Sequence, residues 1–263
     1  MPPSPYHEQV AVITGASSGI GRAIALALAR QGAHVALAAR REASLEELAQ
    51  EVRAMGRQAL VVPTDVTSQE QVERLVRLTI ERWGRVDVLV ASAGQYIRCP
   101  ISELSPEDVR RSMDINFYGS LYAALAVLPG MRQRRSGRIV FISSLDGKKG
   151  LPPDAPYVTA KFALNGFAEV LRQELRGSGV TVTIVLPGRV DTPMLDRLSV
   201  PAISAKIPPE AVANAALKAA HRGKPVLVVP AFGSLLYHIN EFSPRLGDWA
   251  VRFFHLEGWE EKA

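Results

Sequence analysis

The sequence contains little cysteine, few aromatic residues and no strong excess of charge of one sign. Its single cysteine, Cys99, cannot form an internal disulfide and has no companion at metal-ligand spacing, so we expect neither a disulfide framework nor a metal site. This cysteine usage is typical of a cytoplasmic protein. Lys and Arg number 31 against 26 Asp and Glu. Because this modest excess is scattered along the chain, we expect no nucleic-acid partner.

Long apolar runs are also missing. The two longest stretches without Lys, Arg, Asp or Glu are Ile115–Met131 and Pro225–Asn240, and Asn, Gly and Pro interrupt both. Neither provides the roughly 20 predominantly apolar residues that cross a bilayer. Residues Met1–Gln9 lack the basic start and apolar stretch of a secretory signal. We therefore expect no transmembrane segment.

From Val10 onward, short aliphatic runs alternate with longer amphipathic segments. The predicted strands are Val10–Thr14, His34–Ala39, Gln58–Val62, Val86–Ala91, Gly137–Ser143, Val180–Leu186 and Pro225–Val229. The predicted helices are Gly19–Arg30, Ser44–Met55, Gln69–Trp83, Glu107–Met131, Pro156–Arg176 and Glu210–His221. The alternation predicts an α/β fold with a doubly wound, seven-stranded parallel sheet covered by helices on both faces. No repeat or linker divides the chain, so we expect residues 1–263 to form a single domain.

Two segments do not follow this alternation. Residues 190–209 are Pro-rich and irregular, and their length predicts a substrate lid. Apolar residues in and near this lid predict an apolar pocket: Met194, Leu195, Leu198 and Ile203, with Ile97 and Leu151. The C-terminal tail, residues 231–263, is aromatic and mixed in charge, which predicts one or two appended helices. Its apolar face allows a peripheral membrane contact, although such a face more often packs on its own protein or a partner subunit.

A glycine-rich turn follows the first strand and precedes the first helix. Gly15, Gly19 and Gly21 allow a tight turn and a close approach of the backbone to a ligand, while the helix start offers free N–H groups to a pyrophosphate. The predicted cofactor contacts of this turn are Gly15, Ser17, Ser18, Gly19, Ile20 and Gly21. Its position in a βαβ unit favours a dinucleotide site over an ordinary turn.

The end of the second strand predicts which dinucleotide binds. An acidic residue at this place would hold the ribose hydroxyls of NAD, but the chain has Ala39, followed by Arg40 and Arg41. Arginines form charge-assisted hydrogen bonds to a 2′-phosphate, so we expect NADP(H) to be preferred over NAD(H). The alternative is that both arginines only solvate a loop.

Tyr157 and Lys161 are four positions apart and therefore lie on one face of a predicted helix. An ammonium beside a phenol favours the phenolate, so we expect Lys161 to lower the pKa of Tyr157 toward the range of acid/base catalysis. Such pairs also occur by chance on helices. The preceding strand ends in Ser143 and Ser144, and a serine there can hydrogen-bond a substrate oxygen as charge develops on it.

Together these motifs resemble the short-chain dehydrogenase/reductase family over roughly Glu8 to Pro230. The resemblance implies a Rossmann fold and a catalytic tetrad of Asn116, Ser144, Tyr157 and Lys161, with Tyr157 and Lys161 also contacting the cofactor. It assigns Asp65 and Val66 to the adenine ring, Ala93 and Gly94 to the central ribose region, and Pro187, Gly188, Val190 and Thr192 to the nicotinamide end. Family members usually have Asn-Asn-Ala-Gly where this chain has Ala91-Ser92-Ala93-Gly94. Asn116 and Asp65 have structural alternatives, because either side chain is also suited to cap or bend a helix.

The resemblance implies an NADP(H)-dependent oxidoreductase that transfers hydride between nicotinamide and a carbonyl or alcohol substrate, with Tyr157 as general acid/base. Family members commonly pair through the helices that here span Glu107–Met131 and Pro156–Arg176, which implies a homodimer or homotetramer. Two alternatives remain open: a membrane-peripheral enzyme of the same family acting on lipid, steroid or retinoid substrates, and a non-catalytic NADP(H)-binding regulator.

Overall fold

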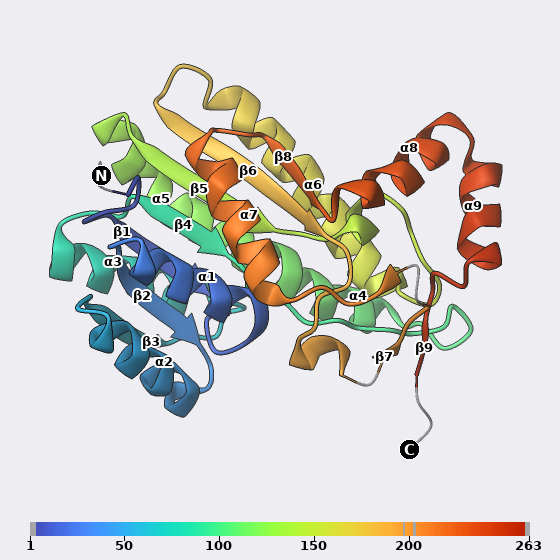
Figure 1. Cartoon of the computed structure of the whole chain (residues 1–263), viewed down its shortest axis with the longest axis horizontal. Helices are drawn as coiled ribbons and strands as arrows, with labels where there is room; N and C mark the ends of the chain where they lie inside the picture. The colour runs from blue at the N-terminus through green and yellow to red at the C-terminus, as the bar shows by residue number, and fades with distance from the viewer. Residues whose placement is uncertain (1–3, 197, 202–203, 261–263) are drawn as a thin grey trace.

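The computed structural model describes residues 4–196, 198–201 and 204–260. A seven-stranded, all-parallel sheet forms its centre, in the order β3-β2-β1-β4-β5-β6-β8 (Figure 1). The strands are β1 Val10–Thr14, β2 His34–Ala39, β3 Ala59–Pro63, β4 Val88–Ala91, β5 Gly137–Ile142, β6 Val180–Pro187 and β8 Val226–Val229. The strand order reverses between β1 and β4, which is where ligands bind in doubly wound sheets. The predicted fold class is confirmed.

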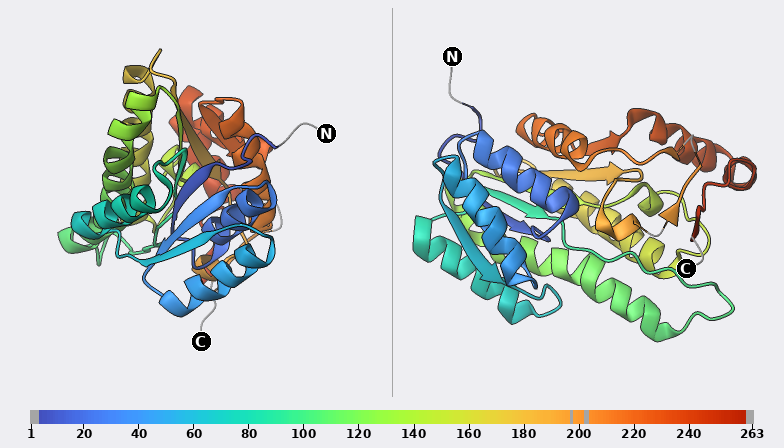
Figure 2. Two further views of the ribbon diagram at one scale, coloured as in Figure 1. Left: turned by 90° about the vertical axis from the view of Figure 1, so that its left-hand side faces the viewer. Right: turned by 60° about the horizontal axis from the view of Figure 1, so that its bottom comes forward.

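Helices cover both faces of the sheet, as the two views of Figure 2 show. One face carries α1 Gly19–Arg30, α2 Glu42–Ala54 and α7 Pro209–His221, and the other carries α3 Gln69–Trp83, α5 Gly119–Arg134 and α6 Ala155–Glu174. Successive side chains of β1 point to opposite faces of the sheet. Val12 packs in the hydrophobic core beneath α3, and Ile13 packs in the core beneath α1. The sheet is thus buried on both faces, and only its ends are free to bind ligands.

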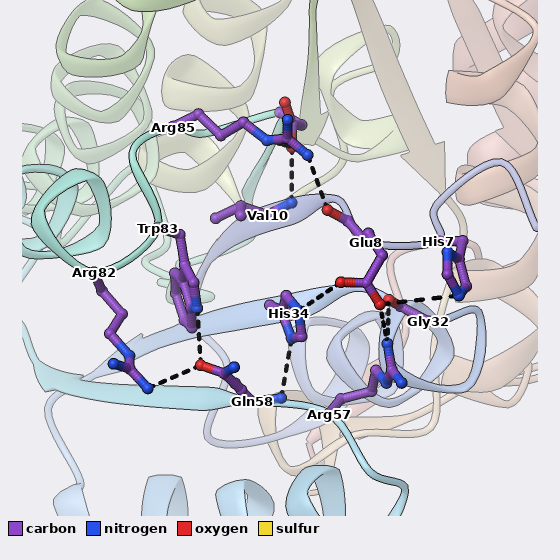
Figure 3. A network of polar contacts seen from close by, with 11 residues as sticks. His7, Glu8, Val10, Gly32, His34, Arg57, Gln58, Arg82, Trp83 and Arg85 are labelled. Carbon is purple, nitrogen blue, oxygen red and sulfur yellow. Dashed lines mark hydrogen bonds and ion pairs between the residues drawn. The ribbon is translucent and has the colours of Figure 1, made fainter.

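A polar network closes the amino ends of β1, β2 and the adjoining loops (Figure 3). Glu8 accepts a hydrogen bond from Arg57 Nη1 at 2.6 Å and contacts His34 Nε2 at 3.2 Å. The Trp83 indole donates to Gln58 Oε1 at 3.1 Å and stacks on the His34 ring at 6.0 Å between centroids. Exposed ion pairs contribute little free energy each, so we assign this network a local role. It connects the loops at the end of the sheet remote from the ligand-binding edge.

The helix predicted over Glu107–Met131 is interrupted, which corrects that prediction. The structure has α4 Pro106–Met113, a π-helical turn Asp114–Tyr118, and then α5. Asn116 lies in the wide turn, and its Nδ2 donates to the Ser112 carbonyl oxygen, four residues earlier, at 3.1 Å. A side chain that bonds the i−4 carbonyl competes with the helical ladder, and single π turns are frequent at functional sites.

The tail contains two helices, α8 Ser234–Phe242 and α9 Pro244–Phe253, which project beyond the sheet (Figure 1). After α9 the chain returns, and the strand β9 Trp259–Glu260 pairs antiparallel with β7 Leu198–Ser199 inside the predicted lid segment. No pattern in the sequence predicted this pairing. Among the described residues, no helix has the length and apolar character needed to span a membrane.

Candidate active site

A cleft of about 540 Å³ opens at the carboxyl ends of the strands, beside the reversal in strand order. It joins the glycine turn after β1 to the ends of β5 and β6 and to the lid segment. Nearly all predicted site residues line it: Gly15, Ser17, Ser18, Gly19, Ile20, Gly21, Arg40, Arg41, Asp65, Val66, Ala93, Gly94, Ser144, Tyr157, Lys161, Pro187, Gly188, Val190 and Thr192. Asn116 is the exception, because its side chain is fully buried behind the wall.

The glycine turn leaves no room for side chains at its centre. Gly15 and Gly19 have φ values of +69° and +55°, a conformation that other residues rarely adopt. A Cβ on Gly21 would lie 2.4 Å from the Gly15 carbonyl oxygen. The Ser18 side chain does not cap α1, so the first N–H groups of this helix remain available to an anion. These residues fit a dinucleotide pyrophosphate.

The residues predicted to select the cofactor lie at one end of the cleft. Arg40 and Arg41 are exposed at its rim, and Arg41 Nη2 donates to Ser17 Oγ at 3.2 Å, which ties the second loop to the glycine turn. Asp65 Oδ1 accepts hydrogen bonds from the Thr67 backbone N–H at 3.0 Å and the Thr67 hydroxyl at 2.8 Å. This carboxylate therefore also stabilises the turn before α3.

Ser144, Tyr157 and Lys161 converge at the other end of the cleft. Ser144 follows β5, while Tyr157 and Lys161 lie on one face of α6; all three are buried. The Ser144 side chain lies near the Tyr157 hydroxyl and lowers its pKa. Lys161 Nζ donates to the Ile142 carbonyl oxygen at 3.1 Å and lies 5.4 Å from the centroid of the Tyr157 ring. The structure thus brings the three predicted side chains together.

The electrostatics of Tyr157 correct one expectation. Burial raises its pKa well above the usual range, and the nearby carboxylates Asp146 and Asp154 raise it further, while the hydrogen bond with Ser144 lowers it. Burial lowers the pKa of Lys161 to about 8, against the opposing effect of Asp146. The pKa of Tyr157 is therefore raised and not lowered toward the catalytic range as expected, because burial dominates and the Lys161 ammonium bonds the Ile142 carbonyl oxygen instead of the phenol. The phenol is therefore protonated at neutral pH.

Asn116 supports the loop after β4. Its Oδ1 accepts from the Gln95 backbone N–H at 3.1 Å, and its Nδ2 donates to the Gln95 carbonyl oxygen at 2.9 Å. A Cβ on Gly94 would lie 2.8 Å from Asn116 Oδ1 and 3.8 Å from Lys161 Nζ, so the loop passes between these side chains. Within the described residues, no hydrogen bond joins Asn116 to Tyr157 or Lys161. Asn116 therefore stabilises the loop that forms this part of the cleft wall.

Sequence reasoning missed a polar group beside Tyr157. Asp154 is fully buried at the start of α6 and accepts hydrogen bonds from the Tyr96 hydroxyl at 2.5 Å and Arg98 Nε at 2.9 Å. The Tyr96 ring meets the Tyr157 ring edge to face, with 5.0 Å between centroids. The position of Asp154 before a predicted helix was the available signal, but a helix cap is the simpler interpretation of such a residue.

Apolar side chains form the wall near Tyr157. The predicted Met194, Leu195, Leu198 and Leu151 line the cleft, Ile97 does not, and Ile203 lies outside the described residues. Leu256, from the tail, also lines it and was not predicted. Arg189 Nη2 donates to the Leu256 carbonyl oxygen, and Arg98 Nη2 donates to that of Glu257 at 3.0 Å. The tail is therefore part of the cleft wall.

Comparison with known proteins gives consistent matches. The profile of the short chain dehydrogenase family matches residues 9–201. The oxidoreductase YxnA of Bacillus subtilis is 37% identical over 251 residues, which cover 92% of this chain and 70% of that protein. Glycine betaine reductase ATRR of Emericella nidulans is 43% identical over 195 residues, 74% of this chain but only 15% of the fungal protein. The chain thus corresponds to a small part of that larger protein.

Two solved structures share the fold. A structure of a variant actinorhodin polyketide ketoreductase with NADPH has a TM-score of 0.80 and 33% identity, and the match covers 87% of this chain and 98% of that one. An alcohol dehydrogenase of the archaeon Thermococcus sibiricus, complexed with 5-hydroxy-NADP, has a TM-score of 0.77 and 32% identity, with 84% and 96% covered.

Proposed function

Because the chain belongs to the short-chain dehydrogenase family and is an oxidoreductase of that class, we propose that it uses NADP(H) to interconvert a carbonyl compound and an alcohol, with Tyr157 as general acid/base. The observation that supports this most strongly is the single cleft that joins the glycine turn to the Ser144–Tyr157 pair. A dinucleotide bound along the cleft from the turn has its reactive end beside these hydroxyls.

The proposed roles follow from the side chains at that end. Tyr157 gives its proton to the substrate oxygen during reduction, and its raised pKa keeps that proton available at neutral pH. Ser144 donates a hydrogen bond to the same oxygen. Lys161 holds the nicotinamide ribose, and Asn116 positions the loop against which it packs. When bound, the nicotinamide supplies or accepts the hydride.

For the cofactor, we propose that the glycine turn holds the pyrophosphate and that Arg40 and Arg41 hold a 2′-phosphate, so that NADP(H) is preferred. The remaining assignments are Asp65 and Val66 to the adenine ring, Ala93 and Gly94 to the central ribose region, and Pro187, Gly188, Val190 and Thr192 to the nicotinamide end. NADPH and 5-hydroxy-NADP are the ligands named for the two structural neighbours, which supports the phosphorylated cofactor.

The test is a panel of ketones, aldehydes and alcohols, each assayed with the phosphorylated and unphosphorylated cofactor at fixed, moderate salt. We expect turnover of some carbonyl compounds, with a higher kcat/KM for NADPH than for NADH. Binding of NADPH without turnover of any panel member would instead favour the non-catalytic regulator.

We further propose that copies of the chain pair through α5 and α6. Leu125, Phe162 and Val170 on these helices are exposed at 52%, 46% and 54%, and pairing through the two helices would bury this apolar surface. The molar mass measured by light scattering should be that of a dimer or tetramer, and Phe162→Glu should lower this molar mass. A monomer at micromolar concentration would contradict this pairing.

A further inference from the structure

A carboxylate without a role in the proposed mechanism lies beside Ser144. Asp146 follows it in the short 3-10 turn Leu145–Gly147 and lines the cleft. Its Oδ2 accepts a hydrogen bond from Ser144 Oγ at 3.1 Å, and its backbone N–H donates to that same oxygen at 3.1 Å. The carboxylate is therefore one hydrogen bond from the atom proposed to hold the substrate oxygen.

Within the described residues, no cation forms an ion pair with Asp146. The charges of Arg189 and Lys161 lower the pKa of Asp146 without a direct ion pair, and the charge of Asp154 raises it. The charge of Asp146 in turn acts on Tyr157. Lys149, which also lines the cleft, donates to Asp248 at 2.5 Å instead. Asp146 is partly exposed and lines the cleft, and its Oδ1 has no hydrogen-bond partner within the described residues. The cleft therefore presents a carboxylate oxygen that is free to accept a hydrogen bond.

This carboxylate competes with a substrate for Ser144. A serine hydroxyl has one proton, and an ionised carboxylate is a stronger acceptor than a ketone oxygen. Burial raises the pKa of Asp146 to about 6, with Asp154 raising it and Ser144, Arg189 and Lys161 lowering it, so the group is mostly ionised at neutral pH. A simple ketone must therefore bind beside an unsatisfied charge that draws away the serine proton.

A substrate with its own hydrogen-bond donor removes this conflict. The donor must be close to the reacting oxygen, because Asp146 Oδ2 is 3.1 Å from Ser144 Oγ. A hydroxyl or ammonium group on the carbon next to the carbonyl satisfies that condition. The apolar wall of Leu151, Met194, Leu195 and Leu256 is then left to contact the rest of the molecule.

We propose that Asp146 is a substrate-binding residue that makes the site prefer carbonyl compounds with a hydroxyl or ammonium group on the adjacent carbon. This inference rests on the proposed function. Anionic substrates are disfavoured by the same carboxylate, and Arg189 Nη1, which has no hydrogen-bond partner within the described residues, is buried.

The test compares four small substrates with NADPH. Hydroxyacetone and aminoacetone carry a donor beside the carbonyl, methoxyacetone carries only an acceptor, and butanone carries neither. The wild-type kcat/KM for the better of the two donor compounds should exceed that for butanone by at least about tenfold, since sites that bond a substrate donor reject analogues that lack it. Methoxyacetone should resemble butanone. The two donor compounds show whether the group is a hydroxyl or an ammonium.

Asp146→Ala should reduce that ratio to within about twofold while NADPH affinity is unchanged, because the acceptor is lost, and Asp146→Asn, whose amide oxygen accepts without a charge, should reduce it partway. Asp114→Asn is the matched control, since that carboxylate is exposed and outside the cleft, and the ratio should be retained. Equal wild-type rates on butanone and both donor compounds, or a ratio that survives in both Asp146 variants, would overturn the inference. If the wild-type protein turned over no carbonyl compound at all, that result would instead contradict the proposed function, and this inference with it.

Discussion

The two ends of the cleft are built differently. At the end assigned to the dinucleotide, backbone forms the surface, in one continuous turn between β1 and α1 where glycines leave no space for side chains. At the Tyr157 end, side chains form the surface, and they come from the loop after β5, the lid segment and the tail. The first end can be identified from a short stretch of sequence. The second depends on segments that only the folded chain brings together.

The largest expected effect is at the Tyr157 end. Tyr157→Phe should lower kcat by about 10² to 10⁴, because it removes the proton donor, while the dissociation constant for NADPH stays nearly unchanged. Kinetics and fluorescence titration of NADPH measure the two quantities. Tyr118→Phe, on the π-helical turn outside the cleft, is the control and should retain activity. Activity of the Tyr157 variant within about tenfold of the wild type would remove the acid/base assignment.

The next effect concerns the cofactor end alone. Ala39→Asp combined with Arg40→Gln should reverse the preference for NADPH, because a carboxylate accepts hydrogen bonds from the ribose hydroxyls and repels a 2′-phosphate. Lost arginine–phosphate bonds of about 1.5 to 3 kcal/mol correspond to roughly tenfold to over a hundredfold in affinity. The measurement is the ratio of kcat/KM values for the two cofactors on one ketone. If the ratio does not change, Arg40 points away from the cofactor.

A third prediction tests whether the backbone surface tolerates a side chain. Gly21→Ala places a Cβ 2.4 Å from the Gly15 carbonyl oxygen, so the turn must shift. We expect a loss of about 1 to 3 kcal/mol in stability together with weaker NADPH binding. Gly166→Ala is the matched control, because nothing lies within 4 Å of its Cβ on α6. Thermal melts with and without NADPH should separate the variants; similar melts would show that the turn is looser than the structure indicates.

The smallest effect concerns the wall contributed by the tail. Leu256→Ala should raise KM for an apolar ketone by roughly fivefold, the equivalent of about 1 kcal/mol of apolar contact, and leave NADPH affinity unchanged. Leu246→Ala makes the same change on the exposed side of α9, outside the cleft, and should not alter KM. Equal KM values for the two variants would mean that substrate does not reach the tail.

Local sequence signals predicted the elements that form the cofactor end. The bounds of β1, α1, β2 and α3 match the predicted ones, because strand alternation, helix periodicity and glycine positions are all local properties. The π-helical turn around Asn116 could not be predicted, since it depends on side-chain bonds to Gln95 and Ser112 that form only in the folded chain.

The same limit applies to the Tyr157 end. The predicted pairing of Tyr157 with Lys161 on one helix face follows from helix geometry. The pKa values depend on burial and on Asp146 and Asp154, whose approach to Tyr157 no spacing rule reveals. Leu256 is 99 positions beyond Tyr157 and is held at the cleft by the pairing of β9 with β7 and by the hydrogen bond from Arg189, neither of which a local pattern reveals.

That pairing has a consequence for how the protein is made and handled. Among the described elements β9 is synthesised last, so the dinucleotide end can assemble before the wall around Leu256 and the ladder between Ser199 and Trp259 form. A tag placed directly after Glu260 would begin beside this ladder. A tag before Ser4 begins instead near the amino ends of the strands, where the network around Glu8 lies (Figure 3). N-terminal fusions are therefore the better choice for kinetic work on this enzyme.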